Sequence, residues 1–346
     1  MQNTVAESIA TLPTAVVLAS LLWWLPQGGY SNTALAALMI YGAVTLLLIK
    51  AVSDNTLLRI QSQMIPALYL TLLAVCGFLH QLQPGSIATL CLAGIVACLF
   101  STYENRRSAT ASLHTGLLLS LGSLAMPPLL LLYPVVLMCQ AIFMRSLSWK
   151  TFAAGWTGLL LPYWFWTAIA LLQSDFTPLC VQWFAITDPV RTPLLALQHS
   201  EPVAAAFWQH AAETLYSGAN PGSLDYTKLN AHPLSMIPMA TSALVVGLLG
   251  LTGYIHYRNT SYDDKIRVRM CYYTFLTLQA VLTLWLLLQP RQYHHLFPLL
   301  LFVTTPPAAH FFAQTGSKAT NAWFIVCIFL LILMAAATLV IPLICH

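Results

Sequence analysis

One short stretch, residues 289–297, holds the densest group of ionisable and aromatic side chains in an otherwise apolar chain. It reads Gln-Pro-Arg-Gln-Tyr-His-His-Leu-Phe and separates two hydrophobic runs. Arg291 presents a fixed fork of donors that fits a phosphate or carboxylate, and Tyr293, His294 and His295 stand beside it. These four residues predict a binding site for an anionic headgroup. The alternative is an interfacial anchor, because arginine and tyrosine also mark the ends of spans that bind nothing.

A second candidate lies in the longest polar segment, residues 173–232. If the protein is an enzyme, Asp175 or Asp188 in this segment is the candidate catalytic base. Residues 201–217 predict a helix with one apolar face, which we expect to lie on the membrane surface. His210 and Glu213 share a face of that helix and could ligate a divalent metal together with His199 or His232, but the motif fixes no third ligand. We therefore predict no metal site, and we expect no cofactor.

The composition sets the class of protein. Of the 346 residues, 58% are hydrophobic and only 7% are charged, and the mean hydropathy is +0.74. A soluble domain carries about 25% charged residues. The chain is therefore predicted to be an all-α, polytopic transmembrane helix bundle that forms a single domain over residues 1–346. The basic residues are scattered over short loops, which argues against a nucleic-acid partner.

Apolar runs of about 20 residues are long enough to cross a bilayer, and their number predicts about eleven spans. The run over residues 111–143 is too long for one span, and Met126-Pro127-Pro128 divides it. A tight hairpin at the prolines or two re-entrant half-helices would both satisfy this pattern. The expected spans cover about residues 9–25, 33–52, 64–79, 86–102, the two halves of 111–143, 151–172, 233–254, 270–288, 296–312 and 322–344.

The basic residues predict the orientation of these spans. If eleven spans alternate across the membrane, one side receives eleven of the fourteen lysines and arginines, and the other side receives only Arg191, Lys228 and Arg291. Basic loops stay in the cytoplasm. We therefore expect the N-terminus inside and the C-terminus outside, with residues 173–232 and 289–297 on the same outer face.

Asp, Glu, Lys and Arg are absent from the middle of the expected spans. Proton-coupled and sodium-coupled transporters usually need such residues or unwound helices, so the transporter class ranks third among the functions considered. His114 and His310 are the histidines expected at depth. Each is interpreted as a hydrogen-bonded helix-packing residue in preference to a proton relay.

Several short motifs follow one another from Tyr103 onward: Glu104-Asn-Arg-Arg, the break at Pro127-Pro128, Tyr133-Pro134, Arg145-Ser-Leu-Ser-Trp-Lys, Gly158-Leu-Leu-Leu-Pro162 and residues 291–297. In this order they resemble a family of uncharacterised multi-pass inner-membrane proteins of the Bacteroidota. The resemblance implies a bacterial inner-membrane location and no particular activity.

A more distant likeness is to the polyprenyl-phosphate-sugar glycosyltransferases, whose active site faces outward and often includes a basic and aromatic patch in a late outer loop. Arg291, Tyr293 and His294 would correspond to that patch. That resemblance also implies an acid in the first outer loop, and residues 27–32 contain none.

These observations lead to two main hypotheses. The first is a non-catalytic or lipid-handling component of envelope biogenesis in the bacterial inner membrane, with an outer-face site for an anionic lipid headgroup. Its expected partners are a membrane lipid, with a lipid phosphate as the candidate ligand, and another membrane protein. The alternative is a glycosyltransferase that uses a lipid-linked sugar donor, for which Asp175 or Asp188 would supply the base.

Overall fold

The computed structural model describes residues 8, 10–24, 32–58, 62–174, 176, 179–180, 182–183, 186, 237–289, 292–315 and 318–345. Every regular element in these residues is a helix. Seven helices are long and apolar enough to cross a membrane. The predicted all-α bundle is therefore confirmed, and the protein is a multi-pass membrane protein.

The described residues of the N-terminal half form six α-helices and a segment of mixed helical type. The α-helices are α2 (Thr11–Trp24), α3 (Asn32–Asn55), α4 (Met64–Val75), α5 (Pro84–Ser101), α6 (Ala109–Ala125) and α8 (Trp149–Gln173). Between α6 and α8 lie the 3-10 helix η3 (Pro127–Leu132), the short α7 (Tyr133–Met138) and the π-helix η4 (Cys139–Phe143). A 3-10 turn, η2 (Gly77–Leu79), follows α4.

The C-terminal part contains four long helices, α12 (Ile237–Thr260), α13 (Ile266–Leu288), α14 (Tyr293–Gln314) and α15 (Lys318–Cys345). A 3-10 turn, η6 (Ser261–Asp263), joins α12 to α13. Each of the eleven expected spans coincides with a helical segment. Four of these segments, Thr11–Trp24, Met64–Val75, Ala109–Ala125 and Pro127–Phe143, are shorter than an ordinary span. The number of crossings therefore stays a prediction.

The structure breaks the apolar run at Met126, which fits both a tight hairpin and two re-entrant half-helices, so the choice between them stays a prediction. Met126 is extended, with φ −132° and ψ 90°, and it ends α6 directly before Pro127 opens η3. The Glu104 N–H, before α6, donates to the Met144 carbonyl, after η4, over 2.8 Å. Both flanks of the apolar run thus meet at one end of the bundle, as two antiparallel segments require.

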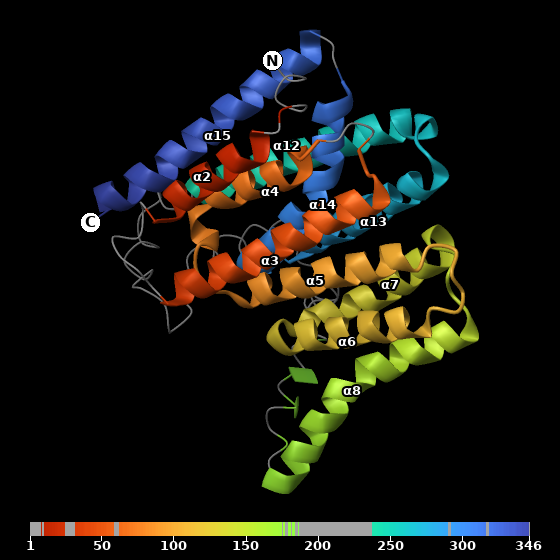
Figure 1. The fold of residues 1–346 in the computed structure, drawn as a ribbon. Coiled ribbons are helices and arrows are strands. Elements are labelled where there is room, and N and C mark those ends of the chain that lie inside the picture. Colours follow the sequence, from red (N-terminus) through yellow and green to blue (C-terminus); the bar gives the residue numbers. More distant parts are fainter. Residues whose placement is uncertain are drawn as a thin grey trace, which may run out of the picture.

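α14 is the central helix of the fold. Of its most apolar 18 residues 94% are buried, against 17% for α15 at the edge of the bundle. α14 packs against α4, α5, α12 and α13. In Figure 1 it lies among these helices, while α8 extends away from the bundle beyond α6. Residues at the two ends of α14 are therefore held by several neighbouring helices at once.

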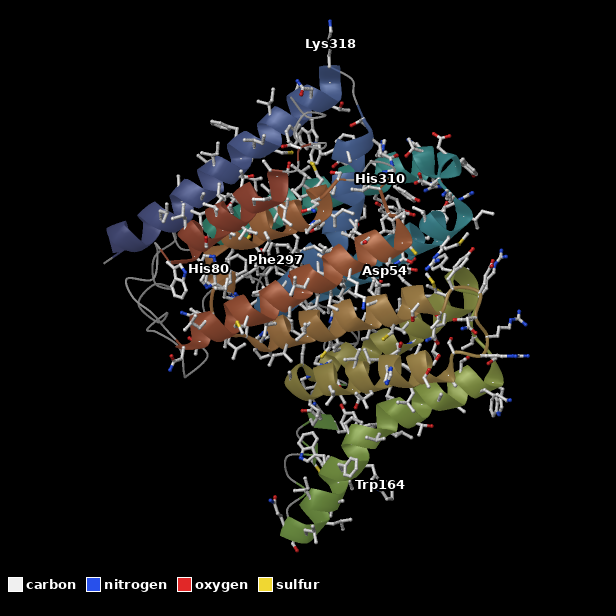
Figure 2. All side chains as sticks on the ribbon, viewed as in Figure 1. Asp54, His80, Trp164, Phe297, His310 and Lys318 are labelled. Atoms are coloured by element: carbon white, nitrogen blue, oxygen red, sulfur yellow. The ribbon has the colours of Figure 1, made fainter. Side chains whose placement is uncertain are left out.

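The loops meet at two opposite ends. We call one the basic end, formed by residues 56–58, 102–108, 144–148 and 261–265, where Arg106, Arg107, Arg145 and Lys265 are exposed. Hydrogen bonds join its loops: Ser146 donates to the Thr102 hydroxyl over 3.2 Å, and Arg267 to the Asn55 side chain over 2.8 Å. The distal end contains residues 76–83 and the starts of α12 and α14. Figure 2 shows His80 at the distal end and Asp54 at the basic end.

Candidate functional site

The first turn of α14 carries three of the four residues predicted to bind a headgroup. The Tyr293 hydroxyl donates to the Met239 carbonyl over 3.0 Å and lies 2.9 Å from the Ser242 hydroxyl. The tyrosine ring packs against Phe78 and Phe297, with centroids 5.9 and 5.0 Å away. Tyr293 therefore fastens α14 to the start of α12, and its hydroxyl is already used within the protein.

The two histidines beside it differ in their surroundings. His294 packs edge to face against Phe78 at 5.7 Å. The backbone of His295 lies against Gly85 at the start of α5, where a Cβ atom would collide with the His295 carbonyl. His295 Nδ1 is buried and has no hydrogen-bond partner, and the same holds for Gln292 Oε1 one turn earlier. Two polar atoms at the start of α14 are therefore unused within the protein: His295 Nδ1, which can donate or accept, and Gln292 Oε1, which can only accept.

The remaining sequence predictions fall outside the described residues. These are Arg291, the candidate bases Asp175 and Asp188, and the surface helix over residues 201–217. The structure thus brings together Tyr293, His294 and His295 next to position 291, and it does not test the enzymatic reading. The acids that are described, Asp54, Glu104, Asp263 and Asp264, all lie at the basic end.

His80 is a distal-end residue that the sequence analysis did not single out. Its ring is buried, stacks on Trp23 with centroids 4.1 Å apart, and donates from Nε2 to the Ala74 carbonyl over 3.0 Å. Burial lowers the pKa of His80 to about 4, although the bond to Ala74 opposes the shift. His80 is therefore neutral near pH 7 and supplies no positive charge for a phosphate.

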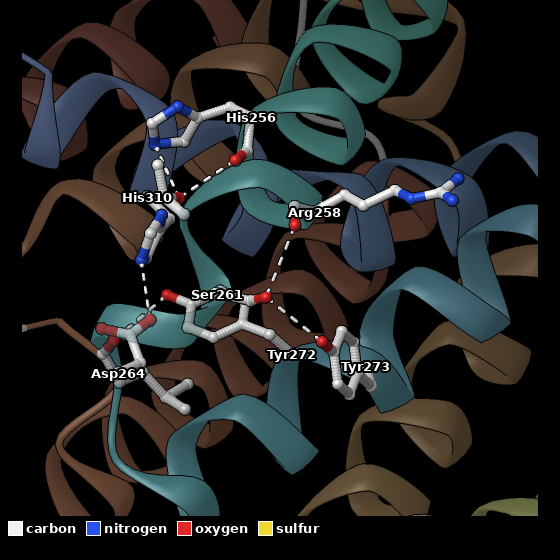
Figure 3. Close-up of polar contacts among 9 residues, drawn as sticks. His256, Arg258, Ser261, Asp264, Tyr272, Tyr273 and His310 are labelled. Carbon is white, nitrogen blue, oxygen red and sulfur yellow. Dashed lines mark hydrogen bonds and ion pairs between the residues drawn. The ribbon is translucent and has the colours of Figure 1, made fainter.

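A buried acid and imidazole pair lies toward the basic end. His310 Nε2, near the end of α14, lies 3.2 Å from Asp264 Oδ2, in the turn between α12 and α13. The side chain of His310 is 0% exposed and that of Asp264 is 4% exposed. Figure 3 shows the carboxylate of Asp264 turned inward toward the imidazole. The α12–α13 turn is thereby joined to the central helix.

Aromatic rings enclose this pair. Tyr257 and Tyr272 pack edge to face against His310 at 4.8 and 4.9 Å, and they contact each other at 4.4 Å. His256 lies 5.7 Å from His310. The Tyr273 hydroxyl donates to the Ser261 hydroxyl over 3.2 Å in the same turn (Figure 3). In this enclosure a charge on either partner is shielded from water, which strengthens the interaction between the two.

The pair changes one sequence interpretation. The expected spans 233–254 and 270–288 leave Asp264 in the loop between them, whereas its side chain is buried and contacts His310 of α14. His310 is a hydrogen-bonded packing residue, as expected, but its partner is an acid. The hydropathy pattern shows only that Asp264 lies beside a charged run. Nothing in the local sequence distinguishes it from Asp263, which is exposed. No group of three potential metal-ligating side chains occurs among the described residues.

No protein-family model, no curated protein and no solved structure matches the chain. The function is therefore inferred from the sequence and the geometry alone.

Proposed function

We propose that this protein is a lipid-handling, non-catalytic component of envelope biogenesis in a bacterial inner membrane, with its distal end on the outer face. Its ligand is an anionic lipid headgroup at the start of α14. The observation that carries the proposal is the pair of buried polar atoms without partners, Gln292 Oε1 and His295 Nδ1, which belong to residues one and four positions after Arg291 in the chain. A buried polar group without a partner costs about 1–3 kcal/mol, which a ligand would offset.

Fewer residues bind the headgroup than the sequence suggests. Because the Tyr293 hydroxyl is occupied by Met239 and Ser242, we assign Tyr293 a positioning role. Arg291 supplies the positive fork, and Gln292 and His295, one and four residues later in the chain, supply further polar atoms. Together they present donors for a phosphate and an acceptor for a neighbouring hydroxyl of the headgroup.

The non-catalytic reading is supported by the charge distribution. A general base for sugar transfer would be a carboxylate at the outer face. Among the described residues, no Asp or Glu lies at the distal end. The glycosyltransferase alternative therefore depends on the acids of residues 173–232 that lie outside the described residues, with Asp175 or Asp188 as the candidate base.

Binding of defined lipids tests the proposal. We expect purified protein to retain dioleoyl phosphatidic acid in native mass spectrometry, and to retain dioleoylglycerol, which lacks the phosphate, at least about tenfold less. Competition between phosphatidic acid and inorganic phosphate distinguishes a site for a lipid phosphate from a site for free phosphate.

Two histidine variants provide the matched comparison. The change His295→Phe should weaken phosphatidic acid binding, because it removes Nδ1 while keeping a planar ring. The change His114→Phe, on the exposed face of α6, should leave it unchanged. Equal retention of both lipids by the wild-type protein would exclude a phosphate site.

The buried His310 and Asp264 pair favours a transporter as the second candidate. An intramembrane or deeply buried ionisable pair is expensive and usually functional. A transporter that moves protons through this pair would conduct them in proteoliposomes under a membrane potential, and His310→Ala would abolish that flux. A wild-type protein without proton flux would exclude this form of the candidate.

A further inference from the structure

The junction of α12, α13 and α14 concentrates the buried polar side chains of the C-terminal half. We call this junction the polar seam. It includes the Tyr293 and Ser242 contact toward the distal end and the His310 and Asp264 pair toward the basic end. The buried polar residues of these three helices and of the turn between α12 and α13 are Ser242, Ser261, Asp264, Thr274, Gln279, Thr304, Thr305 and His310. An apolar environment surrounds the bundle, so such a row requires internal partners for its polar atoms.

The three helices meet closely at the middle of the seam. A Cβ atom on Gly250 of α12 would lie 2.5 Å from Gln279 Nε2 of α13 and 3.2 Å from Thr304 Cγ2 of α14. The absence of a side chain at Gly250 therefore makes room for the Gln279 amide beside Thr304. All three residues lie near the centre of helices that are long enough to cross the membrane.

Two side-chain oxygens at this point have no partner. Gln279 Oε1 and Thr304 Oγ1 are buried and make no hydrogen bond, and their residues are 8% and 1% exposed. Thr304 differs in this respect from its neighbours in the seam. Thr274 and Thr305 both donate to the carbonyl four residues earlier, over 3.0 and 2.7 Å.

The backbone of α14 contributes further oxygens close to Thr304. Pro306 and Pro307 lack the N–H groups that would bond the carbonyls of Phe302 and Val303 in a regular helix. These carbonyls belong to the two residues directly before Thr304 in the chain. The middle of the seam therefore holds the unpartnered Gln279 Oε1 and two carbonyls without their regular helical donors, which suits a cation or a donor molecule and does not suit an anion.

We propose that Gln279 and Thr304, with the carbonyls of Phe302 and Val303, form a mid-membrane binding site for a sodium ion. Sodium is ligated by oxygen, and interrupted membrane helices supply carbonyls for this purpose. The seam also holds Asp264, the one buried carboxylate among the described residues. His310, the partner of Asp264, lies about six residues beyond Thr304 on α14, which is roughly 9 Å along the helix. A nearby carboxylate favours a cation over a neutral occupant of the site.

Thermal unfolding in detergent tests the site directly. The probe is NaCl, titrated against choline chloride at constant ionic strength, with KCl as a second cation. We expect sodium to raise the melting temperature in a saturable manner by about 3 °C or more, because it binds the folded state alone. Potassium should have a smaller effect. Equal melting temperatures in sodium and choline would overturn the proposal and leave water as the occupant.

Variants locate the effect within the seam. In Thr304→Val and Gln279→Leu the sodium-dependent rise should disappear. Thr304→Val should not lower the melting temperature in choline chloride, because it removes a buried hydroxyl that has no partner. Full sodium response in both variants would place the ion elsewhere and overturn the assignment.

Two glycines of α12 give a matched control. Gly250→Ala should displace the Gln279 amide and reduce the sodium response, whereas a Cβ on Gly247 meets no atom within 4 Å. Gly247→Ala should therefore respond to sodium like the wild-type protein. Direct binding of radioactive sodium to the same variants distinguishes loss of the site from a loss of stability. Equal binding by the Gly250→Ala and Gly247→Ala proteins would contradict the proposed position.

Discussion

His310 Nε2 and Asp264 Oδ2 lie 3.2 Å apart, in side chains that are almost wholly buried. The two residues are 46 positions apart in the chain, and their contact fixes the turn between α12 and α13 against the end of α14. Removing one member of a buried pair leaves the other without compensation, which is more costly than replacing both.

A double-mutant cycle should reveal this coupling. We expect His310→Leu and Asp264→Leu each to lower the free energy of unfolding by about 3 kcal/mol. The double variant should lose less than the sum of the two. Chemical unfolding in detergent, monitored by circular dichroism, measures all four proteins. His256→Leu serves as the control, because His256 packs against the His310 ring and its side-chain hydrogen bond is to Thr260. Additive losses would show that the pair is not coupled.

The Tyr293 hydroxyl should contribute to stability and not to ligand binding. We expect Tyr293→Phe to lower the free energy of unfolding by about 1 kcal/mol, because its bonds to Met239 and Ser242 are lost. Retention of phosphatidic acid should be unchanged in native mass spectrometry. If Tyr293→Phe is fully stable but no longer binds the lipid, the Tyr293 hydroxyl contacts the ligand and the prediction is wrong.

Acid should destabilise the protein through His80. The pKa of His80 is lowered to about 4 in the folded state, against 6.5 ordinarily, so the unfolded state binds the proton more readily. This contribution to stability is present above pH 6.5 and is lost as the pH falls toward 4. It amounts to about 1 kcal/mol between pH 8 and pH 5.5. Melting curves of the wild type and His80→Gln at both pH values isolate it. A pH dependence that is identical in both proteins would contradict the assignment.

The orientation across the membrane can be read from reporter fusions. A reporter that is active only outside the cytoplasm should work after Ser223 and after His346, and fail after Asn105 and after Asp264. The reason is the uneven division of basic residues, because basic loops stay in the cytoplasm. Asn105 and Asp264 both belong to the basic end of the structure. Equal activity after Ser223 and Asp264 would refute eleven alternating spans.

The helices were predictable because each is an apolar run bounded by strong signals. The break at Met126 follows from two consecutive prolines, which supply no donors and push the preceding residue out of the helical region. Met126 is extended, as this rule requires. The start of α13 was expected at residue 270, whereas the helix begins at Ile266, because the charged residues of its first turn lowered the local hydropathy.

The candidate sites were less predictable, since their defining contacts join distant parts of the chain. Tyr293 stands in a sequence that suits a headgroup site, and only the fold shows its hydroxyl bonded to Met239. Asp263 and Asp264 are adjacent acids in one turn, and the fold buries only the second. The position of the Gln279 amide beside Gly250 depends on the packing of three helices, which hydropathy does not describe.

The central claim is that Arg291 clamps a lipid phosphate beside His295. An interfacial anchor needs only a cationic side chain of sufficient length, and lysine reaches the interface as well as arginine. A bidentate clamp needs the planar guanidinium, which lysine lacks.

The most direct test compares wild type, Arg291→Lys and Arg291→Ala for phosphatidic acid retention in native mass spectrometry, at equal amounts of folded protein. The account predicts a loss of about tenfold or more for both variants, because the charge without the fork does not hold the phosphate. Retention by Arg291→Lys at the wild-type level would contradict it, and would identify residues 289–297 as an interfacial anchor.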